Sequence, residues 1–163
     1  VQGCTLACKG CWNQDLWTKK GGTDYLVSQL MELIEQSGDE GVTLLGGEPL
    51  EQSDAIFVLL NRINDLGLSI FLYSGFEENE LNEKQRSCVE MSDIVVLGRY
   101  VEELRDTTLR WRGSSNQSLH FPSNRYADME FEEQNEVEVR LDEDGTIQII
   151  GYPDSDFVSE FMD

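Results

Sequence analysis

Residues 3–13 read Gly3-Cys4-Thr5-Leu6-Ala7-Cys8-Lys9-Gly10-Cys11-Trp12-Asn13, which places three cysteines at the spacing C-x3-C-x2-C. Thiolates are soft ligands that suit iron–sulfur clusters or zinc rather than magnesium or calcium. Because the loop is short, it can bring Cys4, Cys8 and Cys11 to three corners of one compact metal centre. A [4Fe–4S] cluster would then keep one iron without a thiolate from this loop, and an open metal position can bind a small molecule.

Other roles are open to these cysteines. A disulfide with a spare thiol is disfavoured, because nothing in the sequence looks secreted and three cysteines in one loop pair poorly. A structural zinc site would need a fourth ligand, which Cys88 or His120 could supply. An electron-transfer cluster normally has four cysteines. The spacing alone therefore leaves zinc and an ordinary cluster as alternatives to a cluster with an open iron.

The composition is that of a folded chain with a strong acidic bias. Hydrophobic residues make up 39% of the 163 residues, which suits one globular domain over the whole chain. The net charge is −20, and residues 128–163 hold 13 acidic side chains against the single base Arg140. Such a field repels phosphate backbones, so we expect no direct nucleic-acid partner. The acidic tail is either a solvated surface or a docking surface for a basic protein.

Neither a membrane anchor nor a targeting segment is recognisable. No apolar run approaches the roughly 20 residues that a membrane helix needs. The first residue is Val1 and the cysteine loop follows at once, so we expect the native N-terminus, with the strand before the loop, to be truncated or outside this chain. We expect a cytoplasmic protein without a membrane partner.

Apolar runs alternate with helical patterns along the first hundred residues. The apolar spacing predicts helices over residues 26–34, 53–66 and 80–91, and strands over residues 41–45, 68–73 and 93–97. Thr23 or Asp24 is the expected cap of the first helix, and Gly38 its end. Strands alternating with helices indicate a parallel sheet with right-handed crossovers.

Unusual residues follow each of these strands. The strand ends are marked by Gly46-Gly47-Glu48, by Ser74-Gly75 and by Gly98-Arg99. In parallel sheets ligands bind at the carboxyl ends of the strands. We therefore expect these residues to meet the cysteine loop at one site.

The last third of the chain is less regular. Residues 101–127 contain a locally basic stretch at residues 109–117. Residues 135–151 predict a β-hairpin, with strands over 136–141 and 146–150 and a turn at Asp144-Gly145. Residues 154–162 could form a short closing helix.

With the loop and the strand ends in hand, the sequence resembles the radical S-adenosylmethionine (SAM) superfamily. The C-x3-C-x2-C loop is its hallmark, and Gly46-Gly47-Glu48-Pro49 is similar to its second motif. Within it, the chain most resembles the anaerobic ribonucleotide reductase activating proteins, small activases of glycyl radical enzymes with a 4Fe–4S single cluster domain. The basis is residues 3–17, 73–75, 98–100 and 112–117. The implied fold is α/β, a partial (β/α) barrel of radical SAM type with a mostly parallel sheet, plus a C-terminal acidic β-hairpin.

The resemblance implies a role for each motif. Cys4, Cys8 and Cys11 would ligate three irons of a [4Fe–4S] cluster, and the fourth iron would bind the amino and carboxylate groups of SAM. Glu48 would accept a hydrogen bond from the SAM amino group or cap the next helix, and Arg99 would pair with a carboxylate or with a surface acid. The full set of expected SAM contacts is Asn13, Gly46, Gly47, Glu48, Ser74, Gly75 and Arg99.

Several other residues have expected places. Trp12 and Trp17 are expected in the core, Cys88 as a buried inert thiol and His120 in a structural role. Arg112 and Asn116 would line the groove that admits a glycine loop of the partner.

The implied function is that of a radical SAM activase, with no catalytic side chain beyond the cluster and SAM. It would cleave SAM reductively to a 5′-deoxyadenosyl radical and install a glycyl radical on the large subunit of anaerobic ribonucleotide reductase. A flavodoxin-like protein would supply the electron. The alternatives are a radical SAM enzyme that modifies a small molecule or a peptide, and a non-enzymatic zinc or Fe–S module.

Overall fold

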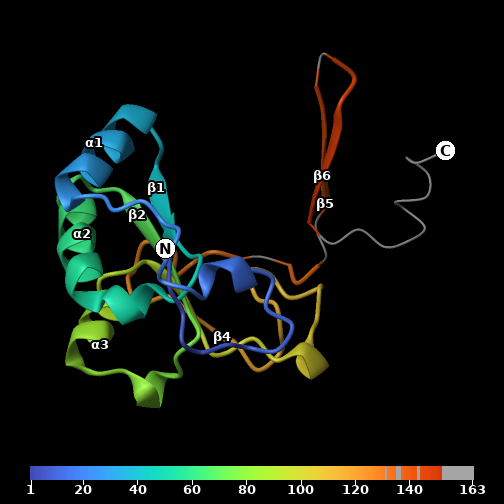
Figure 1. Ribbon diagram of the computed structural model, residues 1–163, viewed down its shortest axis with the longest axis horizontal. Coiled ribbons are helices and arrows are strands. Elements are labelled where there is room, and N and C mark those ends of the chain that lie inside the picture. The colour runs from blue at the N-terminus through green and yellow to red at the C-terminus, as the bar shows by residue number, and fades with distance from the viewer. Residues whose placement is uncertain (131, 135–136, 143, 152–163) are drawn as a thin grey trace.

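A four-stranded sheet with helices on one face forms the main body of the protein (Figure 1). The computed structural model describes residues 1–130, 132–134, 137–142 and 144–151. The helices are α1 (Val27–Ser37), α2 (Ser53–Asp65) and α3 (Glu83–Glu90), with short 3-10 turns η1 (Gln14–Leu16), η2 (Pro49–Gln52), η3 (Glu78–Glu80) and η4 (Glu102–Leu104). The strands of the sheet are β1 (Gly41–Leu44), β2 (Ser69–Ser74), β3 (Ile94–Leu97) and β4 (Ser118–His120). The helix expected at residues 154–162 lies outside the described residues.

The sheet is parallel where the sequence predicts it. The strand order is β1-β2-β3-β4, and β1, β2 and β3 run parallel, with Gly41 opposite Ser69 and Phe71 opposite Ile94. β4 is an addition that the sequence did not predict, and it pairs antiparallel with β3. Over the described residues the four strands form an open sheet, not a closed barrel.

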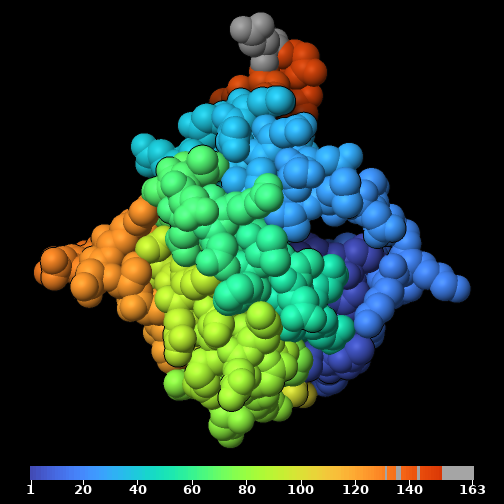
Figure 2. Space-filling view, turned by 90° about the vertical axis from the view of Figure 1, so that its left-hand side faces the viewer, coloured from blue at the N-terminus to red at the C-terminus, as the bar shows by residue number. Residues whose placement is uncertain are grey.

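The core lies between the helices and the sheet. α2 buries the residues that its apolar spacing predicts, Ile56, Leu59, Leu60 and Ile63. They join Ile70 and Leu72 of β2 and Val95 of β3 in one hydrophobic cluster. Figure 2 shows the outer face of this layer, which is covered by the segments of α1, α2 and α3. The opposite face of the sheet is thereby left to the cysteine loop and the segments after β3.

The start of α1 corrects the expected cap. Thr23 and Asp24 are not capping residues, because the helix begins only at Val27 with Leu26 as its N-cap. The backbone N–H of Leu26 donates to Oε1 of Gln29 at 2.8 Å, so a side chain from inside the first turn replaces the usual cap. At the other end Gly38 has φ 72°, which confirms it as the residue that ends the helix.

Residues 1–3 form no strand. They nevertheless lie along the residues that follow β1, since the N–H of Gly47 donates to the carbonyl of Val1 at 2.7 Å and that of Glu48 to the carbonyl of Gly3 at 2.8 Å. These bonds bring the start of the cysteine loop to the end of β1.

The C-terminal hairpin forms as the alternation predicts. β5 (Val137–Leu141) and β6 (Ile147–Gly151) pair antiparallel, with Val139 opposite Ile149 and Leu141 opposite Ile147. It makes a separate two-stranded sheet that stands away from the main body in Figure 1. Among the described residues, no helix has both the length and the apolar character that crossing a bilayer demands.

Candidate iron–sulfur and cofactor site

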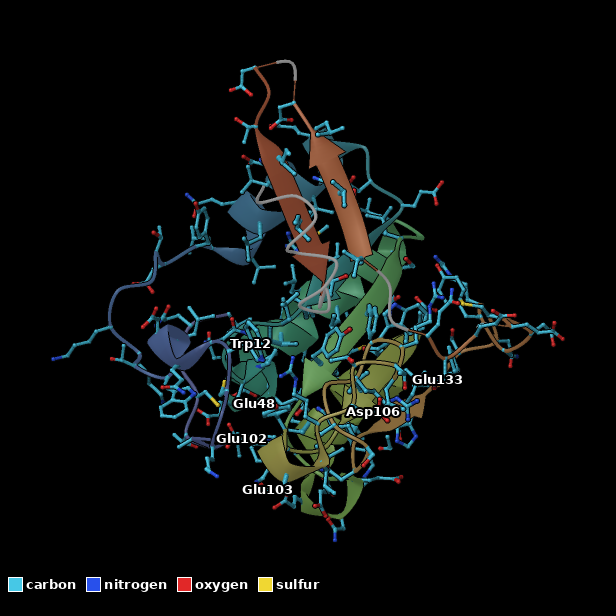
Figure 3. The ribbon with its side chains drawn as sticks, turned by 90° about the vertical axis from the view of Figure 1, so that its right-hand side faces the viewer. Trp12, Glu48, Glu102, Glu103, Asp106 and Glu133 are labelled. Carbon is cyan, nitrogen blue, oxygen red and sulfur yellow. The ribbon has the colours of Figure 1, made fainter. Side chains whose placement is uncertain are left out.

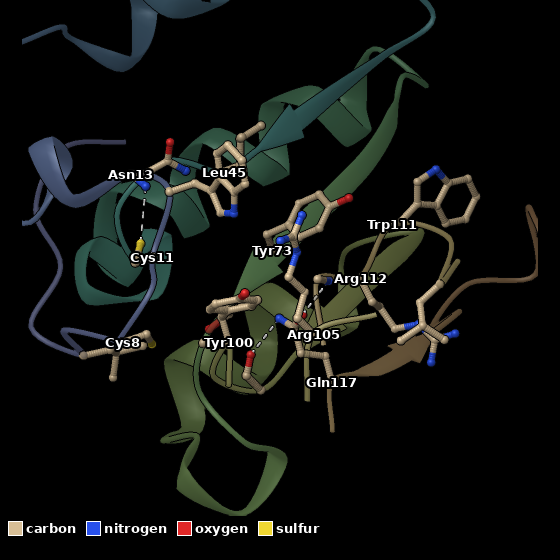
Figure 4. A pocket seen from close by; sticks show the side chains of 18 of the residues that line it. Cys8, Cys11, Asn13, Leu45, Tyr73, Tyr100, Arg105, Trp111, Arg112 and Gln117 are labelled. Atoms are coloured by element: carbon tan, nitrogen blue, oxygen red, sulfur yellow. Dashed lines mark hydrogen bonds between the residues drawn. The ribbon is translucent and has the colours of Figure 1, made fainter. Parts of the chain in front are cut away.

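One cavity of about 510 Å³ lies at the carboxyl ends of the parallel strands. It is lined by Gly46, Gly47 and Glu48 after β1, by Ser74 and Gly75 at the end of β2, and by Gly98 after β3. Cys4, Cys8 and Cys11 line the same cavity. The cysteine loop and the three strand ends therefore line one cavity, as expected (Figure 4).

The cysteine loop is held by bonds to segments far from it in sequence. Its entry is fixed by the N–H of Cys4, which donates to the carbonyl of Trp17 at 3.0 Å. The N–H of Thr5 donates to Oε1 of Glu51 at 2.6 Å. Lys9 reaches two carboxylates of η4, Glu102 and Glu103, each at 3.0 Å. The loop is thus positioned by its surroundings and not by its short sequence alone.

Glu48 is the central polar residue of the strand ends. Its side chain is 1% exposed. Oε1 accepts hydrogen bonds from the N–H of Leu50 (2.8 Å) and from Oγ of Ser74 (2.9 Å), and Oε2 accepts from the N–H of Gly75 (2.7 Å). The bond to Leu50 caps η2, so Glu48 has the capping role that was one of its two expected roles. The other bonds tie the end of β1 to the end of β2.

Burial raises the pKa of the Glu48 carboxyl above its ordinary value, and the charge of Glu51 adds to this. The three hydrogen bonds that the carboxylate accepts oppose the shift, because they favour the ionised form. Glu48 is therefore a desolvated acid that the cavity wall holds in one orientation. Such a group can orient a cationic amine beside it.

Gly46 and Gly47 are glycines because the N-terminal backbone passes against them. A Cβ on Gly47 would lie 2.3 Å from the carbonyl oxygen of Gly3, and one on Gly46 would lie 2.5 Å from the backbone N of Val1. Gly46 also has φ 120°, which L side chains rarely adopt. The close approach here is between two stretches of backbone, and both glycines still line the cavity.

We expect Gly47→Ala to destabilise the protein by about 2–3 kcal/mol, because the methyl group would push residues 1–3 away and break the bond between Glu48 N and Gly3 O. Gly38→Ala is the matched control: its Cβ meets nothing within 4 Å, so only the left-handed backbone costs about 1 kcal/mol. Urea denaturation measures both. Equal losses would show that the contact with Gly3 is unimportant.

Two expected cofactor contacts differ in their placement. Asn13 lines the cavity, and its N–H points to Sγ of Cys11 at 3.4 Å. Arg99 does not line it, because its guanidinium forms two bonds to the carboxylate of Glu80, at 2.6 and 2.9 Å. The structure thus shows the pairing with a surface acid that was the alternative for Arg99. A contact with SAM would require this ion pair to open.

Most of the cavity wall that residues 105–113 build was not predicted from the sequence. Of the two residues expected to line a groove, Arg112 lines the cavity, whereas Asn116 does not and donates to the carbonyl of Arg99 at 2.8 Å. Trp12 and Trp17, beside the cysteine loop, line the cavity and are not core residues, and Trp12 is 68% exposed. The ring of Tyr73 in β2 stacks on that of Phe71, with 4.5 Å between the ring centroids. Phe71 and Trp111 pack edge to face, with 5.3 Å between their ring centroids. The basic stretch supplies the rest of this wall, namely Arg105, Asp106, Thr107, Leu109, Arg110, Trp111, Arg112 and Gly113. Apart from Arg112, only the locally basic composition of residues 109–117 pointed to this wall.

The expected alternatives for a fourth metal ligand lie elsewhere. Cys88 is fully buried in α3, where its thiol points to the carbonyl of Ser53, and His120 contacts Oγ of Ser118 at 2.7 Å on β4. Neither lines the cavity. Over the residues that the structure describes, no three His, Cys, Asp or Glu side chains converge as closely as a single metal ion requires. Cys4, Cys8 and Cys11 are free thiols, and all three line the cavity.

Burial raises the pKa of Cys4, and the charges of Glu48 and Glu51 raise it further. Burial also raises the pKa of Cys8, which a backbone hydrogen bond at Tyr100 and the charge of Arg99 oppose. Ligand thiols must lose their protons to bind metal, so binding at this site releases protons.

We expect alkylation to separate the four cysteines. In cluster-free folded protein, iodoacetamide should modify the three cavity cysteines, which are partly exposed, more than about tenfold faster than Cys88, because the thiolate is the reactive form. Burial raises the pKa of Cys88 to about 11 and also blocks access to it. Mass spectrometry of time points gives the rates. Equal rates in folded protein would contradict the buried position of Cys88, and urea should abolish the difference.

The comparisons with known proteins agree with this arrangement. The profile of the 4Fe–4S single cluster domain matches residues 1–120. The anaerobic ribonucleoside-triphosphate reductase-activating protein of Escherichia coli (strain K12) is 33% identical over 129 residues, which cover 74% of this chain and 84% of the relative. The chain belongs to this family of activating proteins. The proteins of that name from Haemophilus influenzae (32% identical, 74% of this chain and 83% of the relative) and Enterobacteria phage T4 (30%, 73% and 79%) are similar as well.

A protein with a 4Fe–4S domain needs cysteine thiolates that can hold the cluster. The described residues of this chain provide them. Three free cysteines share a cavity wall, and the buried Glu48 faces the same cavity from the strand ends. Cysteine thiolates are the ligands that iron–sulfur clusters use. Cys4, Cys8 and Cys11 are the residues that could hold the cluster, and the rest of the cavity is large enough to admit a small molecule beside it.

Proposed function

We propose that this chain activates an anaerobic ribonucleoside-triphosphate reductase by cleaving SAM at a [4Fe–4S] cluster held by Cys4, Cys8 and Cys11. The observation that carries the proposal is the meeting of three thiols with the Gly46-Gly47-Glu48 turn in one cavity. When bound, the cluster supplies one electron to the sulfonium of SAM, which yields methionine and a 5′-deoxyadenosyl radical that takes a hydrogen atom from a glycine of the reductase. The protein's own part is to bind, orient and shield.

The residues at the strand ends would orient SAM. Glu48 is fixed by three hydrogen bonds and lies beside the cysteines, so its carboxylate can attract the SAM amino group while Gly46 and Gly47 let the ligand approach the backbone. Ser74 and Gly75 are held by the same carboxylate and would contact the ligand next to it. Asn13 would contact it from the cysteine loop.

Aromatic side chains that line the cavity would keep water from a reactive centre. Trp12 and Trp17 come from the N-terminal segment, and Tyr73 and Trp111 come from β2 and from residues 105–113. The open sheet, with parallel strands β1–β3 ending at the cavity, supports a partial barrel of radical SAM type that the reductase would complete by covering its open side. A flavodoxin-like donor and the cytoplasm, where thiols stay reduced, suit this chemistry.

The experiment is anaerobic reconstitution with iron and sulfide, followed by dithionite and SAM. We expect iron and acid-labile sulfide to bind in equal amounts, and then methionine and 5′-deoxyadenosine to form in equal amounts. Addition of the reductase should give a glycyl radical signal in electron paramagnetic resonance. Zinc without acid-labile sulfide would refute the cluster. Rapid conversion of a free small molecule without any reductase would instead favour a different radical SAM enzyme.

A further inference from the structure

The end of the cavity away from the cysteines is basic, although the chain carries a net charge of −20. Arg110 and Arg112 line the cavity beside Trp111, and Figure 4 shows Arg112 and Trp111 apart from Cys8 and Cys11. Arg105 also lines the cavity, but its guanidinium lies over the ring of Trp12, 5.9 Å from the ring centroid. The planar fork of arginine matches the two oxygens of a carboxylate. Two of the 12 basic side chains of this chain, Arg110 and Arg112, thus lie within three consecutive residues on the cavity wall and make a candidate anion site.

A carboxylate of the chain itself already occupies this site. Glu133 accepts a hydrogen bond from the backbone N–H of Arg110 at 2.6 Å and forms an ion pair with Nη2 of Arg112. The Arg112 side chain is 17% exposed, whereas that of Glu133 is 40% exposed. The acid therefore approaches a mostly buried arginine from the surface, and the next residue, Gln134, lines the cavity as well. In the view of Figure 3, Glu133 and Trp12 lie apart from one another.

Glu133 does not engage the whole guanidinium. Nε of Arg112 is buried and has no hydrogen-bond partner among the described residues. A carboxylate in the bidentate position would bond to Nε and Nη2 together. The site is thus shaped for a better seated carboxylate than the one that Glu133 offers.

The segment that brings Glu133 lies beyond the part of the chain that the family profile matches, which ends at residue 120, whereas Arg105, Arg110 and Arg112 lie within that part. The arginines thus belong to the family's domain, and the acid that covers them comes from the appended segment 128–134.

We propose that Glu133 stands in for a carboxylate of the partner protein, and that an acidic segment of the partner docks on Arg110 and Arg112 by displacing Glu133. The inference rests on the proposed function, in which a polypeptide must bring a glycine into this cavity. Because the chain carries a net charge of −20, an acidic segment is attracted most where basic side chains cluster, as Arg110 and Arg112 do here. The arginines would then fix the register of the entering chain.

The test uses the full chain and a fluorescent peptide with the sequence of residues 128–134, Asp-Met-Glu-Phe-Glu-Glu-Gln. In Glu133→Gln the internal competitor is weakened, so the peptide should bind about tenfold more tightly than to the wild-type protein, the scale of one charge-assisted bond. Glu132→Gln, which makes the same change of net charge one residue away, should bind like the wild type. Adding Arg112→Gln to Glu133→Gln should remove the gain.

Two results would overturn the inference: equal binding by Glu133→Gln and the wild type, or equal binding of a peptide whose acids are all glutamine. A gain in affinity cannot come from misfolding, so the Glu133→Gln measurement stands by itself. The proposed function is tested separately, by measuring the 5′-deoxyadenosine that the reconstituted wild-type protein forms. If that product forms but Arg112→Gln binds the reductase as tightly as the wild type does, the docking inference fails while the proposed function stands.

Discussion

Cys8→Ala is expected to abolish iron–sulfur binding and, with it, SAM cleavage. Cys8 is the middle one of three thiols on one cavity wall, and two remaining thiolates leave two corners of a cluster without ligands. Losing an outer-shell partner of a metal site already costs 10–100-fold, so loss of a ligand should lower 5′-deoxyadenosine formation by more than about 100-fold. Iron and acid-labile sulfide analysis after anaerobic reconstitution, with product analysis by chromatography, measures both effects.

The chain offers a matched control for this change. Cys88→Ala also removes one thiol, but from the core between α2 and α3, where Cys88 is fully buried. This variant should lose some stability through the small cavity it creates and keep its full complement of iron and sulfide. A cluster that survives Cys8→Ala and disappears in Cys88→Ala would mean that the ligands are wrongly assigned. Unchanged far-ultraviolet circular dichroism shows that each variant is folded.

Local sequence patterns predicted the parts of the fold in which the spacing of apolar residues agrees with the residues that end helices and form turns. The buried positions of α2 follow the helical period, and Gly38 and Gly67 end their helices with φ near 70°. The register of the hairpin follows from alternation and from the turn at Asp144-Gly145. These features depend on neighbours within a few residues, so the sequence contains the information directly.

What sequence reasoning missed depends on distant contacts. β4 has only three residues, too few for a periodic pattern, and it exists because the open edge of β3 accepts it. Arg99 follows a strand end and pairs with a surface acid, which was one of its two expected roles, but only tertiary contacts decide that this acid is Glu80 of η3. Trp12 is apolar enough for a core position, yet the cavity leaves it 68% exposed. None of these outcomes can be read from the flanking residues.

The candidate site shows the same division. The cysteine spacing and the strand-end glycines marked one wall, because each motif is short and contiguous. The opposite wall is built by residues 105–113, which reach the cavity only through tertiary packing, for example of Trp111 on Phe71. Arg112 was expected at a groove because residues 112–117 take part in the family resemblance, whereas the other residues of this wall showed only a local excess of arginine.

Glu48→Ala is expected to lower stability by about 4 kcal/mol and to remove SAM binding. The carboxylate accepts bonds from Leu50 N, Ser74 Oγ and Gly75 N, and each buried donor left without an acceptor costs about 1–3 kcal/mol. Loss of the acid also separates the end of β1 from the end of β2, where the ligand would lie. Urea denaturation of the cluster-free protein measures the first effect, and equilibrium dialysis of SAM against the reconstituted protein measures the second.

Glu51→Ala is the control, because Glu51 bonds to Thr5 from a more exposed position and contributes no bond between the strand ends. It should cost about 1 kcal/mol, the value of an ordinary hydrogen bond. If Glu48→Ala were no more destabilising than Glu51→Ala, the carboxylate would not be what joins the strand ends.

Glu48→Gln separates the charge of this residue from its shape, and pH reveals the difference. Burial raises the pKa of Glu48 above its ordinary value of 4.5, so the folded protein keeps this proton to higher pH than the unfolded chain does. The free energy of unfolding of the wild type therefore falls as pH rises from about 4.5 through the raised pKa of Glu48, and above that pKa Glu48 causes no further change. Glu48→Gln has no carboxyl group at this position and does not lose this stability. The stability advantage of the wild type over Glu48→Gln should shrink over this window. An advantage that grows with pH would mean that the three accepted hydrogen bonds outweigh burial and hold the carboxylate ionised, and the same bonds would then prepare a permanent negative charge for the amine of the ligand.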